Sequence, residues 1–450
     1  MSPRRARRLK TSVAIVAILA QLGAAVTPAA AFCGFYVAKA DSKLFNKASK
    51  VVLSWDSGKT AVTMANDYEG DPKEFAIVVP MPTFIERKQI GVVDMKTIDH
   101  LDAFTAPRLV EYRDPDPCAP AIAMDSAGFG GRPMAAPASA QLERAKAYRG
   151  VTVEATYDVA EYDVSILSAK ESNGLVDFLG DNGYRLPEGA EAVLGSYIKQ
   201  RMHFFIAKVN LKRLQQSGSS YLRPLQVRYE TAKFMLPLRL GTVNADGPQD
   251  LVVFALTKKG RIEASNYRTV KMPSNVDVPL FVKDDFTNFY KATFEHAVAR
   301  EGMHGVFVEY AWDMGWCDPC AAAPMSKAEL TELGALWDGG DGDTIANRFQ
   351  PVPRNGNDPF VTRLHVRYDA KSFPEDLSLT ETHDRGNFQG RYILHHAFVG
   401  PAACTAAAKY RDELQARFQK EAMNLADLTG WPQQAIETRM RATGEPLRGR

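Results

Sequence analysis

The sequence predicts an α+β protein with a mainly antiparallel sheet core, interspersed helices and a C-terminal amphipathic helix. Strand-like runs dominate residues 149–270, and two helical patterns interrupt them. Near the N-terminus, the turn signal Asp56–Ser57–Gly58 separates two extended runs, and an apolar stripe with helical spacing runs through residues 410–428. This mixture of strand and helix patterns is typical of the α+β class.

The first 31 residues have the pattern of an export signal. Five basic residues precede an apolar stretch at 13–26, and the alanines at 29–31 are the small residues that a signal peptidase prefers. The apolar stretch is too short to be a good membrane span. We therefore expect cleavage near Ala31 and a periplasmic or secreted protein. Because Phe32 and not a small residue precedes Cys33, we expect no lipid anchor.

Composition limits the kinds of partner. Cleavage would leave 450 − 31 = 419 residues, enough for two or three ordinary domains or one large one. The mature chain would carry 55 − 5 = 50 basic residues against 53 acidic ones, a net charge of −3. A nearly neutral chain has no general electrostatic reason to bind nucleic acid. No other stretch has the ~18 consecutive apolar residues of a spanning helix, so we expect no transmembrane segment in the mature chain.

Residues 32–118 are predicted to form an N-terminal α+β region. Extended runs at 50–55 and 59–66 flank the hairpin turn, and the apolar run at 75–79 lies between prolines, as a buried strand would. Residues 109–112 precede a stiff extended segment at 114–118, because each proline disfavours helix at the residue before it. Helical spacing predicts a helix that carries Met95, Ile98, Leu101 and Phe104.

Residues 119–148 are rich in Ala, Gly and Pro and have no periodicity, so we expect a flexible loop there. Residues 149–282 are predicted to form a strand-rich α+β region, with helices after Ser172 and at 188–200. Residues 258–260 are typical of a hairpin tip. The expected strands of this region are 151–157, 162–167, 203–211, 225–229 and 251–257.

Residues 283–450 are predicted to form a C-terminal α+β region. It contains a strand at 305–312, a short helix capped by Ser326, and further strands at 360–368 and 390–398. Thr405 is expected to cap a long helix that Gly430 ends, and a last helix begins at Pro432. The apolar stripe of the long helix comprises Tyr410, Leu414, Phe418, Leu425 and Leu428.

The sharpest chemical motif is Cys317-x-x-Cys320, which follows an apolar strand and a tryptophan. At a helix start, the amide dipoles would lower the pKa of the first thiol and make it a nucleophile. In this window the chain resembles the active-site segment of thioredoxins, a strand followed by Trp-Cys-x-Pro-Cys and a helix. The resemblance implies that Cys317 attacks and Cys320 resolves, with Pro359 near the position of the thioredoxin cis-proline.

Structural disulfides are the competing interpretation, and the sequence favours them. Exported chains use cysteines as cross-links that restrain the unfolded state by ~2–4 kcal/mol. Two bridges among five cysteines leave fifteen arrangements, and the sequence does not choose among them. A zinc site would need four ligands, and the chain has no second Cys-x-x-Cys. The disulfide candidates are Cys33, Cys118, Cys317, Cys320 and Cys404.

Two other groups of residues are expected to be ordinary surface or core features. The acidic residues Asp67, Glu69 and Asp71, and those at 338–343, lack the Gly and Glu positions of a helix–loop–helix calcium site, so solvated turns are favoured. The adjacent His395 and His396 would face opposite sides of a strand. The other histidines considered have no metal-ligand spacing, so neither a metal nor a cofactor is expected; they are His304, His365 and His383.

Several phrases of the sequence together resemble one protein family. They include residues 33–41, 64–68, 72–80 and 106–112, together with Trp316 to Cys320 and residues 387–392. They are similar to the exported bacterial proteins grouped as the domain-of-unknown-function family 2330. The resemblance spans nearly all the mature chain and implies a secreted or periplasmic bacterial protein. It implies no activity, so it supplies no catalytic residues.

These observations leave two main hypotheses about function, with a calcium-dependent module as a third possibility. The first is an exported, disulfide-stabilised envelope or secreted module that is not an enzyme and binds an unidentified partner. The second is a thiol–disulfide oxidoreductase that uses Cys317 and Cys320.

Overall fold

The computed structural model describes most of the chain between residues 29 and 445. The described residues are 29–30, 35–39, 45–69, 75–119, 151–186, 189–217, 221–244, 247–316, 318, 322–335 and 358–445. Sheets and helices are both abundant, so the predicted α+β class is confirmed. The signal-like segment and the predicted loop at 119–148 lie almost entirely outside these residues.

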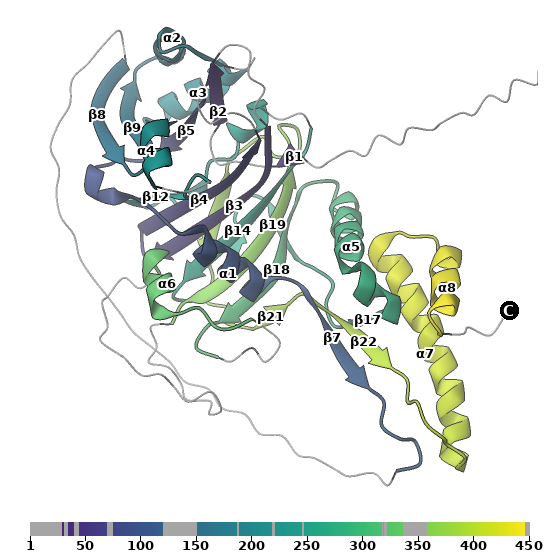
Figure 1. The fold of residues 1–450 in the computed structure, drawn as a ribbon. Helices are drawn as coiled ribbons and strands as arrows, with labels where there is room; N and C mark the ends of the chain where they lie inside the picture. The colour runs from purple at the N-terminus through teal and green to yellow at the C-terminus, as the bar shows by residue number, and fades with distance from the viewer. Residues whose placement is uncertain are drawn as a thin grey trace, which may run out of the picture.

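Ten described strands form the largest sheet, which runs through the middle of the molecule (Figure 1). Most neighbours are antiparallel, as predicted, but β14 runs parallel to β3 and β16 runs parallel to β18. Two short strands join outside the main order: β1 (Ala29–Ala30) pairs with β14, and β21 (Phe388–Gln389) pairs with β18. The main order is β16 (Arg268–Lys271), β18 (Gly305–Asp313), β19 (Phe360–Tyr368), β14 (Gln249–Thr257), β3 (Phe45–Asp56), β4 (Lys59–Glu69), β12 (Leu225–Glu230) and β6 (Ile90–Val92).

A six-stranded sheet packs face to face on the larger one. Its inner face contributes Ile77, Val164 and Phe205 to a core that also holds Leu53 and Val253 of the large sheet. Two helices, α2 (Ser172–Asp181) and α3 (Ala190–Lys199), cover its outer face. The strand order is β10 (Tyr184–Arg185), β2 (Phe35–Lys39), β5 (Phe75–Met81), β11 (His203–Val209), β9 (Tyr162–Ala169) and β8 (Val151–Val159).

The other face of the large sheet is covered in part by helices α1 (Met95–Thr105) and α6 (Lys327–Glu332). Apolar side chains of the sheet, such as Phe254 and Tyr310, pack there with Leu101 and Leu330. Ser326 caps α6 as predicted, and its hydroxyl accepts a hydrogen bond from the backbone N–H of Glu329. We call this side of the large sheet the outer face, because the six-stranded sheet covers the opposite side.

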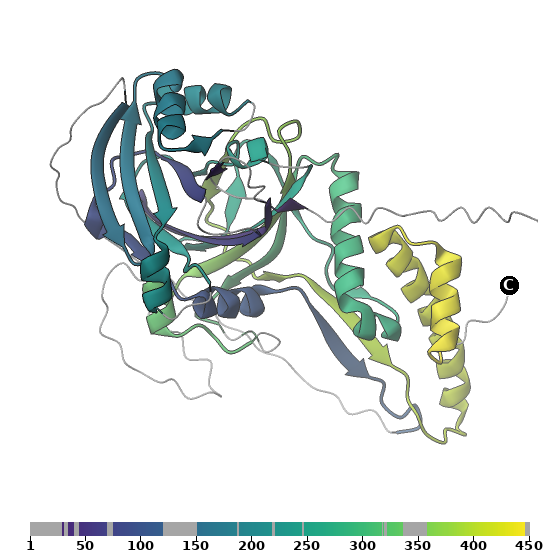
Figure 2. The same ribbon diagram turned by 45° about the horizontal axis from the view of Figure 1, so that its top comes forward.

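A second, smaller body projects from the large sheet, and we call it the arm (Figure 2). Its parallel sheet has the order β17 (Val276–Asp277), β22 (Arg391–His396) and β7 (Arg108–Arg113). A helical core packs on this sheet through residues such as Phe289, Tyr392 and Leu425. The helical elements of the arm are η4 (Leu280–Asp285), α5 (Phe286–Arg300), α7 (Thr405–Thr429) and α8 (Gln433–Ala442).

The remaining elements are short. A three-stranded sheet has the order β13 (Met235–Leu236), β20 (Leu377–Glu381) and β15 (Ile262–Ala264). The short helical elements are η2 (Arg87–Gln89), η3 (Gly241–Asn244) and α4 (Leu211–Ser217). Within the described part of the chain, no helix combines the length and the hydropathy that crossing a membrane would require.

Two predictions about the ends of secondary-structure elements are wrong. Residues 258–260 are not a hairpin tip, because β14 and β15 belong to different sheets. Gly260 is needed there for a different reason: a Cβ atom would lie 2.4 Å from the carbonyl oxygen of Asp384. Thr405 does not cap α7 but is its first residue, and the capping position belongs to Cys404. Gly430 ends α7 with a φ of 70°, as predicted.

The large sheet also joins distant parts of the sequence. Apart from β1, its strands come from residues 32–118, 149–282 and 283–450, the three regions predicted from the sequence. The arm likewise joins β7 of the first region to β22 and α7 of the last.

Candidate functional site

A bulge in β18 places a buried carboxylate, Glu309, on the outer face of the large sheet. The pairing of β18 with β19 shifts register between Val308 and Tyr310. Val308 packs in the core between the two sheets, whereas Tyr310 packs edge-on against Phe104 of α1 on the outer face. The extra residue of the bulge therefore directs Glu309 and Tyr310 to the same side, which regular alternation would prevent.

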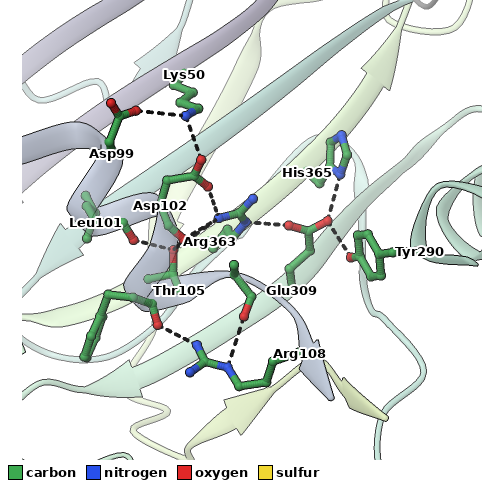
Figure 3. Close-up of polar contacts among 12 residues, drawn as sticks. Lys50, Asp99, Leu101, Asp102, Thr105, Arg108, Tyr290, Glu309, Arg363 and His365 are labelled. Atoms are coloured by element: carbon green, nitrogen blue, oxygen red, sulfur yellow. Dashed lines mark hydrogen bonds and ion pairs between the residues drawn. The ribbon is translucent and has the colours of Figure 1, made fainter. Parts of the chain in front are cut away.

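Arg363 of β19 holds one oxygen of this carboxylate. Its Nε donates to Glu309 Oε2 at 2.5 Å, and the guanidinium also pairs with the carboxylate of Asp102 on α1 (Figure 3). Nη1 donates further to the Asp102 carbonyl oxygen at 3.1 Å and to Thr105 Oγ1 at 3.3 Å. Burial lowers the pKa of Arg363, but the two carboxylates outweigh it and raise the pKa overall.

The second oxygen of Glu309 contacts two further side chains. Nδ1 of His365 lies 2.7 Å from Oε1, and the hydroxyl of Tyr290 on α5 donates to the same oxygen at 2.6 Å (Figure 3). The Glu309 side chain is only 1% exposed. Burial raises its pKa, but the charges of His365 and Arg363 and the hydrogen bonds from His365 and Tyr290 lower it to about 2. Glu309 is therefore an ionised acceptor.

The charged contacts continue towards solvent at one end. Lys50 of β3 lies 2.6 Å from Asp102 Oδ2 and 3.4 Å from Asp99 Oδ1. Burial raises the pKa of Asp102, but Arg363 and Lys50 outweigh it, so the pKa is lowered overall. We call the connected set the Glu309 network; its members are Lys50, Asp99, Asp102, Thr105, Tyr290, Glu309, Arg363 and His365.

A second ion pair borders the network at the other end. Arg367 donates from Nε and Nη2 to the two oxygens of Asp250, at 2.7 and 2.6 Å. Nε2 of His365 lies 4.0 Å from Asp250 Oδ1, and its ring stacks on Phe294 with the ring centroids 3.6 Å apart. The His365 ring is therefore held in place by contacts from both α5 and β14.

The network holds its charged and polar groups in fixed positions. Its two hydroxyl groups already donate elsewhere, Tyr290 to Glu309 and Thr105 to the Leu101 carbonyl oxygen at 2.8 Å. Burial and the charge of Glu309 raise the pKa of Tyr290 well above its usual value, so the phenol stays protonated. Across the described ranges, no group of three or more His, Cys, Asp or Glu side chains could hold a metal ion.

One pair of the candidate cysteines forms a disulfide. Cys118 and Cys404 are bonded, with Cα atoms 5.9 Å apart and 286 positions apart in the sequence. The bond attaches the chain beyond β7 to the start of α7. Nearby, Asp114 accepts a hydrogen bond from Tyr410 at 2.5 Å and pairs with Arg417 at 2.9 Å. Three contacts therefore fix the arm helix to this segment.

The other three candidate cysteines, Cys33, Cys317 and Cys320, lie outside the described residues, so their pairing stays a prediction. Of their neighbours, Trp316 is 47% exposed. Asp318 is buried and accepts hydrogen bonds from Tyr310 and Gln389.

The context of the Cys317-x-x-Cys320 motif differs from a thioredoxin segment in two described features. Helix α6 begins only at Lys327, and β18 and β19 are antiparallel. Pro359 does lie directly before β19, and none of the described peptide bonds is cis.

The structure also shows where some of the acidic residues and histidines considered in the sequence lie. Asp67 and Glu69 lie in strand β4 and not in a turn, because the hairpin partner β3 extends the ladder to Phe45. Asp71 and residues 338–343 fall outside the described ranges. His395 and His396 contact different carboxylates, Asp277 at 3.2 Å and Glu111 at 2.7 Å, as expected for neighbours on a strand.

Among the remaining histidines, His304 makes a backbone contact with Ser372, and His365 belongs to the Glu309 network. That network was not predicted from the sequence. One signal was present: Arg363, His365 and Arg367 alternate with apolar residues in a predicted strand, which places all three on one face. The partners of these residues come from elements far away in the sequence, and the bulge that directs Glu309 towards them leaves no signature of its own.

Comparison with known proteins gives one family. Residues 27–380 match the family model described as "Uncharacterized protein conserved in bacteria (DUF2330)". No curated protein and no solved structure matches the chain. The matched range contains the Glu309 network and Cys118 but ends before β22 and α7.

Proposed function

The chain belongs to the DUF2330 family of uncharacterized bacterial proteins, and we propose that it is an exported, disulfide-stabilised binding module and not an enzyme. The observation that carries the proposal is the Cys118–Cys404 bond. Disulfides form and persist in oxidising compartments such as the periplasm and the cell exterior, and they are rare in the cytosol. The signal-like pattern of residues 1–31 supports the same location.

The Glu309 network supports binding over catalysis. Enzyme sites commonly keep a base or nucleophile whose pKa is moved towards the working pH. Here the pKa of Glu309 is held at about 2, and that of Tyr290 is raised well above its usual value. Both groups therefore keep one protonation state near neutral pH, which suits a rigid scaffold.

A thiol–disulfide oxidoreductase remains the alternative, favoured by the Cys317-x-x-Cys320 motif and by the exposed Trp316 beside it. A redox-active pair would exchange readily with glutathione at a potential well above about −300 mV. A Cys317–Cys320 bond that glutathione does not reduce, or a bridge from either residue to a distant cysteine, would exclude this alternative.

Cell fractionation tests the proposed location. The full chain is expressed in a bacterium and compared with a variant that lacks residues 13–26. We expect the full chain in the periplasm or the medium, shortened by the mass of about 31 residues, and the deletion variant unprocessed in the cytosol. Both proteins in the cytosol at full length would contradict export.

A further inference from the structure

A pocket of about 490 Å³ lies beside the three-stranded sheet, and its lining residues are distinct from the Glu309 network. Its wall is formed by β13 and β20, by the end of α3 and by the turn between β15 and β16. Its volume falls in the range of about 300–1,000 Å³ that is typical of small-molecule sites.

Hydrogen bonds fix the polar wall of the pocket. Asp376 Oδ1 accepts from the hydroxyl of Tyr197 at 2.6 Å and from the backbone N–H groups of Leu238 and Arg239 at 2.9 and 3.2 Å. Asn266 Nδ2 donates to the Asp376 carbonyl oxygen at 2.8 Å. These bonds join α3, β20 and the β15–β16 turn, so the wall is ordered before any ligand binds.

The apolar part of the lining is fixed by aromatic packing. Phe234 stacks on Trp55 of the large sheet, with ring centroids 4.3 Å apart and planes 6° apart. Met235 and Leu379 line the pocket beside it. An aromatic or aliphatic group of a ligand could pack on this surface.

Two cationic side chains line the pocket without a carboxylate partner among the described residues. Neither Lys233 nor Arg239 lies within 4.0 Å of a carboxylate in the described part of the chain, whereas Arg363 and Arg367 each pair with two. Arg239 makes one side-chain hydrogen bond, from Nη1 to Ser196 Oγ at 2.7 Å.

The two carboxylates of the pocket, Glu375 and Asp376, by contrast already accept hydrogen bonds from the protein. Asp376 accepts the three hydrogen bonds given above, and Glu375 accepts from Asn266 at 3.3 Å. Lys233 and Arg239 are the cationic donors of the lining, and Gln200 and Ser378 add a side-chain amide and a hydroxyl.

We infer that this pocket binds a small organic anion, in which a carboxylate or phosphate is attached to an apolar group. Lys233 and Arg239 hold the anionic group, and Phe234, Met235 and Leu379 contact the apolar part. The inference rests on the proposed binding function and gives it a site and a ligand class. Binding is measured on purified protein, so its outcome is independent of where the cell places the chain.

Matched probes test the inference on the full chain with its disulfide intact. Phenylacetate and its neutral isostere phenylacetamide are titrated by ligand-observed NMR, and phenyl phosphate serves as a third probe. We expect both anions to bind with a Kd of order 1–10 mM, the amide at least ~5-fold more weakly, and the anions to weaken as salt rises. The tighter of the two anions identifies the preferred headgroup.

Variants locate the binding. We expect Lys233→Gln and Arg239→Gln each to weaken phenylacetate binding by at least ~3-fold, while Lys96→Gln, on α1, leaves it unchanged. Lys233 is exposed, so its replacement leaves the fold intact. The inference is overturned if neither anion binds up to ~20 mM, if the amide binds as well as the acid, or if the Lys233 and Lys96 variants behave alike.

Discussion

The Nε atom of Arg363 lies 2.5 Å from Oε2 of Glu309, across two neighbouring strands at a bulge of the large sheet. Both groups are nearly excluded from solvent, with side chains 11% and 1% exposed. A buried pair of this kind is costly to break, because removing one partner leaves the other as an uncompensated charge.

Neutralising either partner should therefore destabilise the fold. We expect Glu309→Gln and Arg363→Met each to lower the free energy of unfolding by about 3–5 kcal/mol, measured by urea denaturation. The exposed helix pair Lys409–Glu413 is the matched control, and Lys409→Gln should change stability by less than about 0.5 kcal/mol. Equal effects of the buried and exposed changes would show that the network does not stabilise the fold.

The double variant Glu309→Gln/Arg363→Met tests whether the two residues act together. If the pair is coupled, its loss is smaller than the sum of the two single losses, because no unpaired charge remains between them. Strict additivity would mean that each residue acts through other contacts.

Glu421 on α7 predicts a dependence of stability on pH. Its side chain is 1% exposed; burial and the charge of Glu445 raise its pKa from 4.5 to about 8, although Arg417 opposes the shift. Between those pH values the folded chain binds a proton that the unfolded chain has lost. The stability that this group contributes therefore falls as pH rises from about 4.5 to about 8.

Glu421→Gln removes this titration. The free energy of unfolding of the variant, relative to that of the unchanged protein, is expected to rise by roughly 2–4 kcal/mol as the pH goes from 5 to 8. Urea denaturation at both pH values measures it. Glu413, which is 61% exposed on the same helix, provides the control Glu413→Gln, and it should show no such gain. A Glu421→Gln gain that is the same at both pH values would refute the buried-carboxyl account.

The disulfide should stabilise the arm. We expect Cys404→Ser to lower the free energy of unfolding by about 2–5 kcal/mol and to expose α7 to protease. The adjacent contact of Tyr410 with Asp114 gives a comparison, and Tyr410→Phe should cost only about 1 kcal/mol. If the cysteine variant is as protease-resistant as the unchanged protein, the bond is not what holds α7.

Gly260 should not tolerate a side chain. A Cβ atom there would lie 2.4 Å from one backbone oxygen and 2.9 Å from another, so Gly260→Ala should lower the melting temperature, at a cost of about 1–3 kcal/mol. Gly180, in helix α2, has open space around it, and Gly180→Ala should stabilise by about 0.5–1 kcal/mol. A neutral Gly260→Ala would show that the close approach is relaxed in solution.

Local structure was predictable from the sequence where the residues of one short segment determine it. The turn at Asp56–Gly58 sets the register of β3 and β4, and an apolar stripe closed by Gly430 defines α7. The parallel pairing of β3 with β14 was not predictable, because nothing in either strand specifies a neighbour about 200 residues away. Sequence also left the partner of Cys118 open among several arrangements, since pairing depends on where the folded chain places each sulfur.

The candidate site was harder to predict than the fold. Its charges, such as Lys50, Asp102 and Glu309, are ordinary surface residues by type, and they become a network only because α1 and β18 meet on one face of the sheet. The alternation of Arg363, His365 and Arg367 indicated a polar face on an otherwise apolar strand, but not its partners.

Differential alkylation of the protein recovered from cells tests the central claim most directly. Thiols that are free in the cell are blocked at once, disulfides are then reduced and labelled with a second reagent, and each cysteine is assigned by mass spectrometry. The account predicts a polypeptide that begins near Phe32, with Cys118 and Cys404 carrying only the second label. An intact N-terminus with both residues blocked at the first step would contradict it.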